Sequence, residues 1–183
     1  SYSERLLKTV NIGRDVRSED LQVRVEDVIE DRVAVNVIEV KPGSTLTRRI
    51  VEKLPVERGV IKPDPSRDIM MAAVIDRHKA TGSIGLGFLK GLNLRVGAIA
   101  QTIAHDTHNL IVAGYSFSDM ERAIKHIIEM QGGIVVVDKG VVVASLNLQY
   151  GGLMSIEEPE VVYVKYRELI EKLKRDYSVS FEA

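Results

Sequence analysis

One uninterrupted apolar run near the middle of the chain most strongly constrains what this sequence can fold into. Residues 69–75 read IMMAAVI, with no polar side chain between the first and the last. A strand with one wet face would alternate apolar and polar residues, so this short continuous run predicts a strand buried on both faces. Val and Ile carry much of the apolar content and aromatic residues are few, which also favours strands.

Alternating residues predict three strands before this central run. Residues 21–26 and 33–40 place an apolar side chain at every second position, as a strand with one solvent-facing side would. Residues 46–56 alternate with Arg, Glu and Lys, which indicates an exposed or edge strand. A turn is expected at residues 41–44, KPGS, because proline restricts φ and glycine tolerates positive φ.

Further strands and a hairpin are predicted after the central run. The hairpin joins residues 134–137 to residues 141–146 through the turn Asp138-Lys139-Gly140, in which glycine permits a tight reversal. The other strand-like segments in this half of the chain are residues 84–89, 98–104 and 110–113.

Two segments carry the periodicity of amphipathic helices. Residues 118–131 begin with a predicted capping box, Ser118 and Glu121, and are expected to end at Gly132-Gly133. Residues 159–175 form the second predicted helix. The apolar stripes comprise Met120, Ala123, Ile124, Ile127 and Ile128 in the first helix, and Val162, Tyr166, Leu169, Ile170 and Leu173 in the second.

Together these elements predict an α+β (or α/β) fold, with mixed, largely antiparallel β-sheet layers and two amphipathic helices packed against them. A chain of 183 residues has the length of a single domain. The proline-containing loop at residues 62–66 separates a predicted N-terminal strand layer, residues 1–62, from a main body, residues 63–183. The tail after Tyr177 is expected to be mobile.

Composition narrows the functional classes. The absence of cysteine excludes disulfides, thiolate zinc sites and cysteine nucleophiles. A formal net charge of -1 argues against nucleic-acid binding, and no apolar run approaches the roughly 20 residues needed to cross a bilayer. No signal-peptide core opens the chain, so a cytoplasmic location is expected. Apolar strands beside charged edges favour a homo-oligomer.

The richest cluster of reactive side chains is His105, Asp106, His108 and Asn109. Such groups can ligate a metal, move protons or hydrogen-bond the edge of a heterocycle. The flanks resemble strands, so the two imidazoles converge only if the backbone turns at Asp106-Thr107. The alternative is a polar bend that satisfies local amides. We do not expect this pair alone to bind a metal, because a third ligand at a recognisable spacing is lacking.

A second candidate is Asp76-Arg77-His78, which directly follows the central run. Sites are often built at strand ends, so Asp76 and His78 are candidate residues at the edge of a binding site. The alternative is a surface salt bridge between Asp76 and Arg77.

These residues belong to a series of motifs that resembles the C-terminal domain of prokaryotic adenine deaminase, a member of the amidohydrolase superfamily. The resemblance extends over roughly residues 11–175 with the motifs in the same order. The matching segments read VIDRH at 74–78, TG at 81–82, GLGF at 85–88, GAIA at 97–100, AHDTHN at 104–109, GGIVVV at 132–137 and GLMS at 152–155.

The resemblance implies conversion of adenine and water to hypoxanthine and ammonia by a divalent metal centre, of manganese, iron or zinc, in a TIM barrel. The barrel's ligands follow a His-x-His pattern, which this sequence lacks, and a barrel needs about 200 residues or more. The chain is therefore expected to bind no cofactor, to be inactive alone and to need a barrel domain or subunit as its partner.

The leading hypothesis is that the loop at residues 105–109, together with His78, faces the mouth of that barrel. Two other hypotheses stay open. The chain could be a stand-alone module that binds a purine or another small ligand without catalysis, or it could be an oligomerisation domain.

Overall fold

The computed structural model describes residues 3–26, 30–41, 43–44 and 46–177, and in these ranges the strands form one nine-stranded sheet. The tail after Tyr177 and Pro42 of the predicted turn lie outside them; within that turn the Ser44 amide donates to the Lys41 carbonyl at 3.2 Å. The strands are β1 (Arg32–Val40), β2 (Thr47–Glu57), β3 (Val60–Ile61), β4 (Ile69–Ile75), β5 (Ile84–Lys90), β6 (Ala98–Gln101), β7 (Leu110–Gly114), β8 (Gly133–Asp138) and β9 (Val141–Asn147). The helices are α1 (Phe117–Met130) and α2 (Pro159–Tyr177), with short 3-10 turns η1 (Glu4–Leu7), η2 (Ser18–Leu21) and η3 (Pro65–Arg67).

The sheet has the order β3-β2-β1-β5-β4-β7-β6-β8-β9. Every neighbouring pair is antiparallel except β1 and β5, which are parallel. The predicted α+β class, with a mixed and largely antiparallel sheet and two helices, is therefore confirmed. No helix within the described ranges is long and apolar enough to span a membrane.

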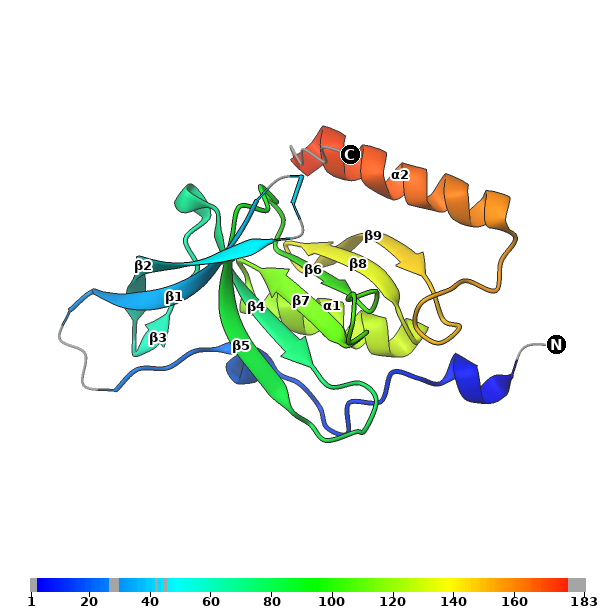
Figure 1. Ribbon diagram of the computed structural model, residues 1–183, viewed down its shortest axis with the longest axis horizontal. Coiled ribbons are helices and arrows are strands. Elements are labelled where there is room, and N and C mark those ends of the chain that lie inside the picture. Colours follow the sequence, from blue (N-terminus) through cyan, green and yellow to red (C-terminus); the bar gives the residue numbers. More distant parts are fainter. Residues whose placement is uncertain (1–2, 27–29, 42, 45, 178–183) are drawn as a thin grey trace.

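Strand β4 lies at the centre of the sheet, as its uninterrupted apolar sequence predicts. Six of its seven residues are buried, and only Val74 is exposed. Met71, Ala73 and Ile75 belong to the core that includes α1, whereas Met70 belongs to a second core that includes α2. Figure 1 shows α1 behind the sheet and α2 along β9 on the other side. The two helices thus cover opposite faces.

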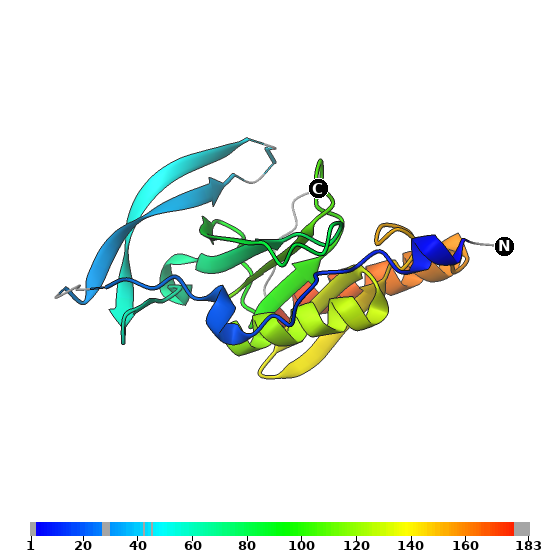
Figure 2. The ribbon, with the colours of Figure 1, turned by 90° about the horizontal axis from the view of Figure 1, so that it is seen from below.

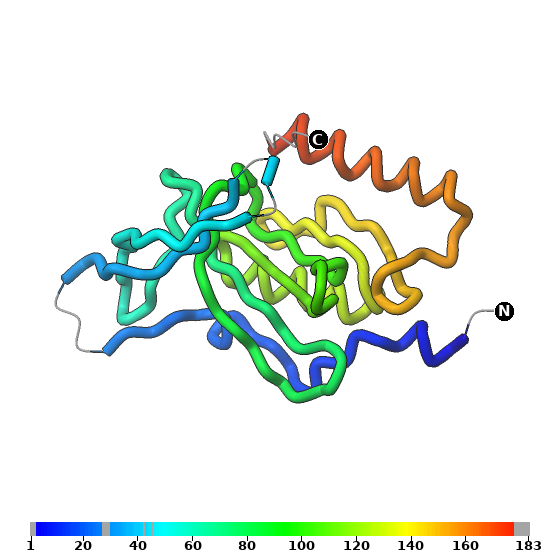
Figure 3. The backbone as a smooth tube through the Cα atoms, viewed as in Figure 1, coloured from blue at the N-terminus to red at the C-terminus, as the bar shows by residue number. Residues whose placement is uncertain are grey.

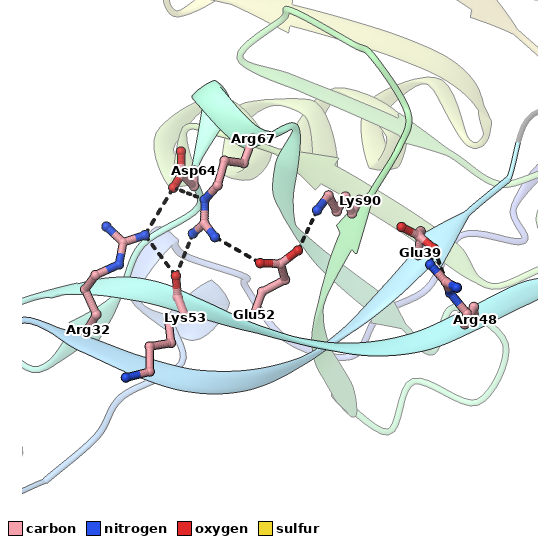
Figure 4. Close-up of polar contacts among 8 residues, drawn as sticks. All are labelled: Arg32, Glu39, Arg48, Glu52, Lys53, Asp64, Arg67 and Lys90. Carbon is pink, nitrogen blue, oxygen red and sulfur yellow. Dashed lines mark hydrogen bonds and ion pairs between the residues drawn. The ribbon is translucent and has the colours of Figure 1, made fainter.

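The hairpin of β1 and β2 curves away from the rest of the sheet (Figure 2) and is attached mainly through β5. Figure 4 shows the polar contacts that reinforce this attachment. Glu52 on β2 accepts from Lys90 Nζ at 2.5 Å and from Arg67 Nη1 at 2.9 Å, while Arg67 Nε donates to Asp64 at 2.8 Å. The hydrogen bond from Lys90 lowers the pKa of Glu52, which keeps this carboxylate charged.

The predicted strand at residues 21–26 is wrong. Leu21 closes the turn η2 and is fully buried in the core, and only Arg24 forms an isolated bridge, with Val60. The segment is nevertheless extended beside β3, since the Val25 amide donates to the Gly59 carbonyl and the Ile61 amide to the Val23 carbonyl, both at 2.9 Å. Val23 and Val25 pack against the core while Arg24 and Glu26 are exposed, which explains the alternation. Because β3 has only two residues, the pairing does not extend into a strand.

The ends of α1 also differ from the prediction. Ser116, rather than Ser118, caps the helix, and its hydroxyl accepts from the Asp119 amide at 3.2 Å. Glu121 does not complete a capping box, because it accepts instead from the amide and hydroxyl of Ser18. At the other end Gln131, with φ of 61°, adopts the left-handed conformation that we expected of glycine. The predicted capping box therefore does not form, because Ser116 caps the helix and Glu121 binds Ser18.

The N-terminal arm runs along one side of the molecule (Figure 3) and is held by backbone contacts to two distant loops, residues 76–83 and the loop that contains Gly151. The Leu6 carbonyl accepts from the Gly151 amide at 2.7 Å, and the Asn11 amide donates to the Arg77 carbonyl at 3.1 Å. The Ile12 carbonyl accepts from the Gly82 amide at 2.9 Å. The arm thus passes the end of β4, where the candidate site residues lie.

Candidate functional site

The predicted site residues lie where β4 and β6 end and β7 begins. Because β4 and β7 are antiparallel neighbours, the segment after Ile75 lies beside the segment before Leu110. The two loops are joined by a hydrogen bond of 3.0 Å between His78 Nε2 and the Thr107 carbonyl. Residues 76–78 and 105–109, which are separated along the chain, therefore lie together at the ends of the central strands, and we call this end of the strands the site edge of the sheet.

Arg77 is the structural centre of this edge. Its side chain is 1% exposed, and its guanidinium donates to carbonyls of three different segments. Nε donates to His108 at 2.5 Å, Nη1 to Thr9 at 3.1 Å, and Nη2 to Gly151 at 3.0 Å. Within the described ranges no carboxylate pairs with it, so the predicted alternative of an Asp76–Arg77 salt bridge is wrong. Burial lowers the pKa of this guanidinium, since desolvation disfavours the charge.

The loop at Gly151-Gly152 fits against Arg77 because glycine has no side chain. A Cβ at Gly152, where φ is +72°, would lie 2.6 Å from Arg77 Nη1. The Gly152 carbonyl accepts from the buried Thr102 hydroxyl at 2.6 Å, and that hydroxyl accepts from the Gly133 amide at 2.8 Å. Three loops are thus locked around one cation.

The backbone of the histidine loop turns, as convergence of its side chains requires, but it divides the four candidates into two pairs. Asp106 and His108 adopt positive φ of 70° and 49°, a conformation that is uncommon for residues other than glycine. His105 and Asp106 face solvent, with side chains 95% and 85% exposed and a contact of 2.9 Å between Nδ1 and Oδ1. His108 and Asn109 are half-buried. The structure therefore does not bring all four together.

Three buried polar atoms near this edge have no hydrogen-bond partner within the described part of the chain: His108 Nδ1, Asn109 Oδ1 and Gln149 Oε1. An unsatisfied buried group costs about 1–3 kcal/mol, so their retention requires an explanation. His108 and Asn109 are adjacent, and Gln149 lies two residues before the Gly151 carbonyl that Arg77 binds. Imidazole and amide groups can hydrogen-bond a heterocycle or a second protein surface, but these three atoms are shielded from solvent, so such contacts require the loop to open.

Asp76 and His78 organise the neighbouring loop. Asp76 accepts from the Thr81 hydroxyl at 2.7 Å and from the His78 amide at 3.0 Å. The bond from Thr81, followed by those from the amides, lowers the pKa of Asp76 to about 2. Asp76 is thus a charged acceptor at neutral pH, with its hydrogen bonds directed into its own loop, and His78 connects that loop to Thr107.

The residues present do not fit a metal centre. Across residues 3–26, 30–41, 43–44 and 46–177, no three His, Cys, Asp or Glu side chains gather closely enough to hold an ion. A cleft of about 780 Å³ lies at the opposite ends of β6 and β7, between Gly97, Tyr115 and Asp119. None of the candidate histidines lines it, so we place the candidate site on the contacts around Arg77.

Sequence reasoning identified the histidine loop and named Arg77 only within the segment Asp76-Arg77-His78, with Asp76 and His78 as the candidate residues. It missed Gln149 and the Gly151-Gly152 turn. Residues 69–75 are apolar at every position, so the sequence does not show which way the side chain of Arg77 points. In the structure Arg77 continues the side of Ala73 and Ile75 into the core. No sequence signal pointed to Gln149.

Comparison with known proteins identifies relatives of this chain. Residues 44–183 match the family described as the adenine deaminase C-terminal domain. The adenine deaminase of Staphylothermus marinus is 53% identical over 182 residues, which cover 100% of this chain and 30% of that protein. The adenine deaminase of Halalkalibacterium halodurans is 40% identical over 159 residues, covering 87% of this chain and 26% of the relative. That of Thermosipho africanus is 45% identical over 135 residues, covering 74% and 23%. The chain thus spans less than a third of the length of these relatives.

Proposed function

This chain belongs to the adenine deaminase C-terminal domain family, and we propose that it forms the substrate-facing edge of an enzyme that converts adenine and water to hypoxanthine and ammonia. The relatives at 53% and 40% identity are named adenine deaminases, and this chain covers 30% and 26% of their lengths. The remaining portion is the proposed source of catalysis. We also propose that it is an amidohydrolase barrel, that it carries the manganese, iron or zinc ion, and that the assembly is a cytoplasmic homo-oligomer.

One observation carries this proposal: the buried and unpaired His108 Nδ1 and Asn109 Oδ1 lie in a strained loop that Arg77 holds. Positive φ at a non-glycine residue costs about 1–3 kcal/mol and persists where surrounding contacts impose it, as the contact from Arg77 does here. We infer that the loop opens when the remaining portion of the enzyme docks, and that it then offers these hydrogen-bonding groups to the substrate.

The chemistry of these two side chains suits a purine. A carboxamide pairs at two points with adenine, accepting from the exocyclic N6 amine and donating to N7. In this arrangement Asn109 Oδ1 gains the donor that it lacks, and hypoxanthine, whose O6 is an acceptor, would face it unfavourably. His108 provides a second contact that can also move a proton. His105, Asp106 and His78 lie at the rim, where they would face the barrel.

The test is a full-length chimera in which this chain replaces the matching segment of the Staphylothermus marinus adenine deaminase. Asn109→Ala is expected to lower kcat/KM for adenine about 10- to 100-fold, mainly through KM, because a buried hydrogen bond is worth about 1.4–2.7 kcal/mol in such a site. Asn36→Ala is the matched control, because Asn36 lies on the hairpin and accepts from Arg49 at 2.9 Å. An unchanged kcat/KM in Asn109→Ala would contradict the proposed role.

The 183-residue chain alone provides the complementary measurement. We expect no turnover of adenine with or without added Mn²⁺, since catalysis is assigned to the remaining portion. Calorimetric titration with adenine and hypoxanthine separates the alternatives: tight binding by the lone chain would favour a stand-alone purine-binding module, and turnover by it would overturn the proposal.

A further inference from the structure

Exposed large apolar side chains are concentrated around the start of α2. Of 14 exposed large apolar residues in the described ranges, six fall within residues 154–166. The six are Met154, Ile156, Val161, Tyr163, Val164 and Tyr166, with exposures of 38% to 60%; we call the three that line one groove, Met154, Tyr163 and Tyr166, the α2 patch. Single exposed apolar residues are ordinary, but a group that lines one groove marks an interaction surface.

The patch results from the way α2 is anchored. Only Leu169 and Leu173, in the second half of the helix, are fully buried, and they pack into the core around Val136 and Leu146. The first half projects past this anchor along β9 (Figure 1). A groove of about 460 Å³ opens beneath it, with Leu148 among the residues that line it. Its lining is mostly apolar, so it is shaped for an apolar segment rather than for a charged ligand.

The exposed half of α2 needs a partner on physical grounds. Most of the stability of a helix in a protein comes from packing its apolar face, and two-turn segments are marginal in water. Tyr163 and Tyr166 are three positions apart, so they lie on one stripe of the helix, and both line the groove together with Met154. Val161 and Val164 form a separate stripe that does not line the groove. Tyrosine and methionine, two of the residue types in the α2 patch, are enriched at protein interfaces.

We propose that the α2 patch is the surface on which the remaining portion of the deaminase docks; this inference rests on the proposed function. Relatives that this chain matches carry most of their length outside the matched segment, so a large body of chain must contact this domain. The occupant is therefore that portion, through an apolar segment inserted under α2.

Continuity with the candidate site supports this occupant. Met154 pairs with Tyr150 in an isolated bridge, the adjacent Gly151 carbonyl accepts from Arg77, and Arg77 also holds His108. Leu6, 39% exposed, lies beside the same loop through its carbonyl. A body that completes the site around His108 thus meets the α2 patch next to it.

The two most exposed large apolar residues of the described ranges, Leu46 and Val51, do not form a comparable surface. Leu46 and Val51 are more exposed, at 76% and 64%, but Arg48 and Arg49 lie between them in the sequence. Desolvating these arginines would oppose docking at that hairpin. Leu46 and Val51 therefore serve as controls rather than as a competing interface.

Hydrogen exchange tests the proposal in the full-length chimera and in the 183-residue chain. Amides of residues 159–166 are expected to exchange at least about tenfold more slowly in the chimera, because docking suppresses local opening of the helix. Amides of residues 47–51 on β2 should not change. Equal exchange of residues 159–166 in both proteins would overturn the proposal. So would concentration-dependent protection in the chain alone, because a second copy would then be the occupant.

Paired variants separate docking from the function of the site. Tyr163→Ser with Tyr166→Ser should abolish the protection in the chimera, while Leu46→Ser with Val51→Ser should retain it. Exchange at residues 169–173 checks that the helix itself stays folded. Asn109→Ala is expected to weaken adenine binding while leaving the protection intact. Unchanged adenine binding in Asn109→Ala, with the protection intact, refutes the proposed function alone. Protection that survives in Tyr163→Ser with Tyr166→Ser refutes the docking surface.

Discussion

Replacing Arg77 by methionine is the most direct perturbation of the proposed architecture. Methionine occupies a similar volume without the cation, so it removes four hydrogen bonds to Thr9, His108 and Gly151. Three of the four acceptors are backbone carbonyls, and each costs about 1–3 kcal/mol if it stays buried and unpaired. Relief of the desolvated charge offsets part of this loss. We therefore expect the free energy of unfolding to fall by about 3–5 kcal/mol, because the loss at three backbone carbonyls exceeds the relieved desolvation.

A loss of this size is readily measured. For a chain of 150–250 residues each kcal/mol lowers Tm by about 2–4 °C, so Arg77→Met should lower Tm by about 6–20 °C. Urea titration should show a lower midpoint with an unchanged m-value. Arg77→Lys should lie between the two proteins, since a single ammonium cannot reach carbonyls on three segments with the geometry of a guanidinium.

The matched control is Arg48→Met. Arg48 is 60% exposed and pairs with Glu39 at 2.6 Å, so its removal should cost no more than about 1 kcal/mol. Hydrogen exchange should also localise the effect of Arg77→Met, with faster exchange at residues 104–109 and 150–152. A loss for Arg77→Met equal to that for Arg48→Met would refute the view that this cation joins the three segments.

Two further predictions concern the same edge of the sheet. Gly152→Ala is expected to lower the free energy of unfolding by about 2–4 kcal/mol, because the new Cβ would combine positive φ with overpacking against Arg77. Gly140→Ala should lower it by about 1 kcal/mol, since Gly140 has φ of +77° and nothing within 4 Å of its Cβ position. Equal losses for the two variants in urea titration would contradict this reasoning. The folded-state pKa of Asp76, about 2, lies below the unfolded value near 3.9, so the stability from its ionised form is present above pH 4 and is lost as the pH falls toward 2. The difference in stability between wild type and Asp76→Asn should therefore shrink from pH 5 to pH 2, and a constant difference would refute the assignment.

Much of the fold follows from local sequence patterns. The apolar run of β4, the hairpin of β8 and β9, and both helices have periodicities that only one type of element explains. The predicted strand at residues 21–26 does not form for a specific reason. An alternating segment becomes a strand only when a neighbouring strand is long enough to pair with it, and β3 has two residues. The prediction of separate regions at residues 1–62 and 63–183 stays a prediction, although β1 joins β5 within the same sheet.

The candidate site was foreseen only in part. A polar turn at residues 105–109 follows from its composition, but the division of its side chains depends on positive φ at Asp106 and His108. Asn109 and Gln149 are 40 positions apart in the sequence, and nothing in their local patterns indicates that both hold buried, unpaired acceptors. The roles of His105, Asp106, His78 and Asp76 toward a substrate stay predictions.

The sequence by itself determined most of the strands and both helices, because hydrophobic periodicity acts between neighbouring residues, but it predicted a strand at residues 21–26, extended β6 to residue 104 and gave no sign of β3. Only the tertiary structure decided what Arg77 does. Its hydrogen bonds reach residues 31, 68 and 74 positions away, and the carbonyls that it binds are a feature of every residue in the chain. Backbone acceptors leave no mark in a sequence, so a buried cation held by them becomes recognisable only when the fold brings the three loops together.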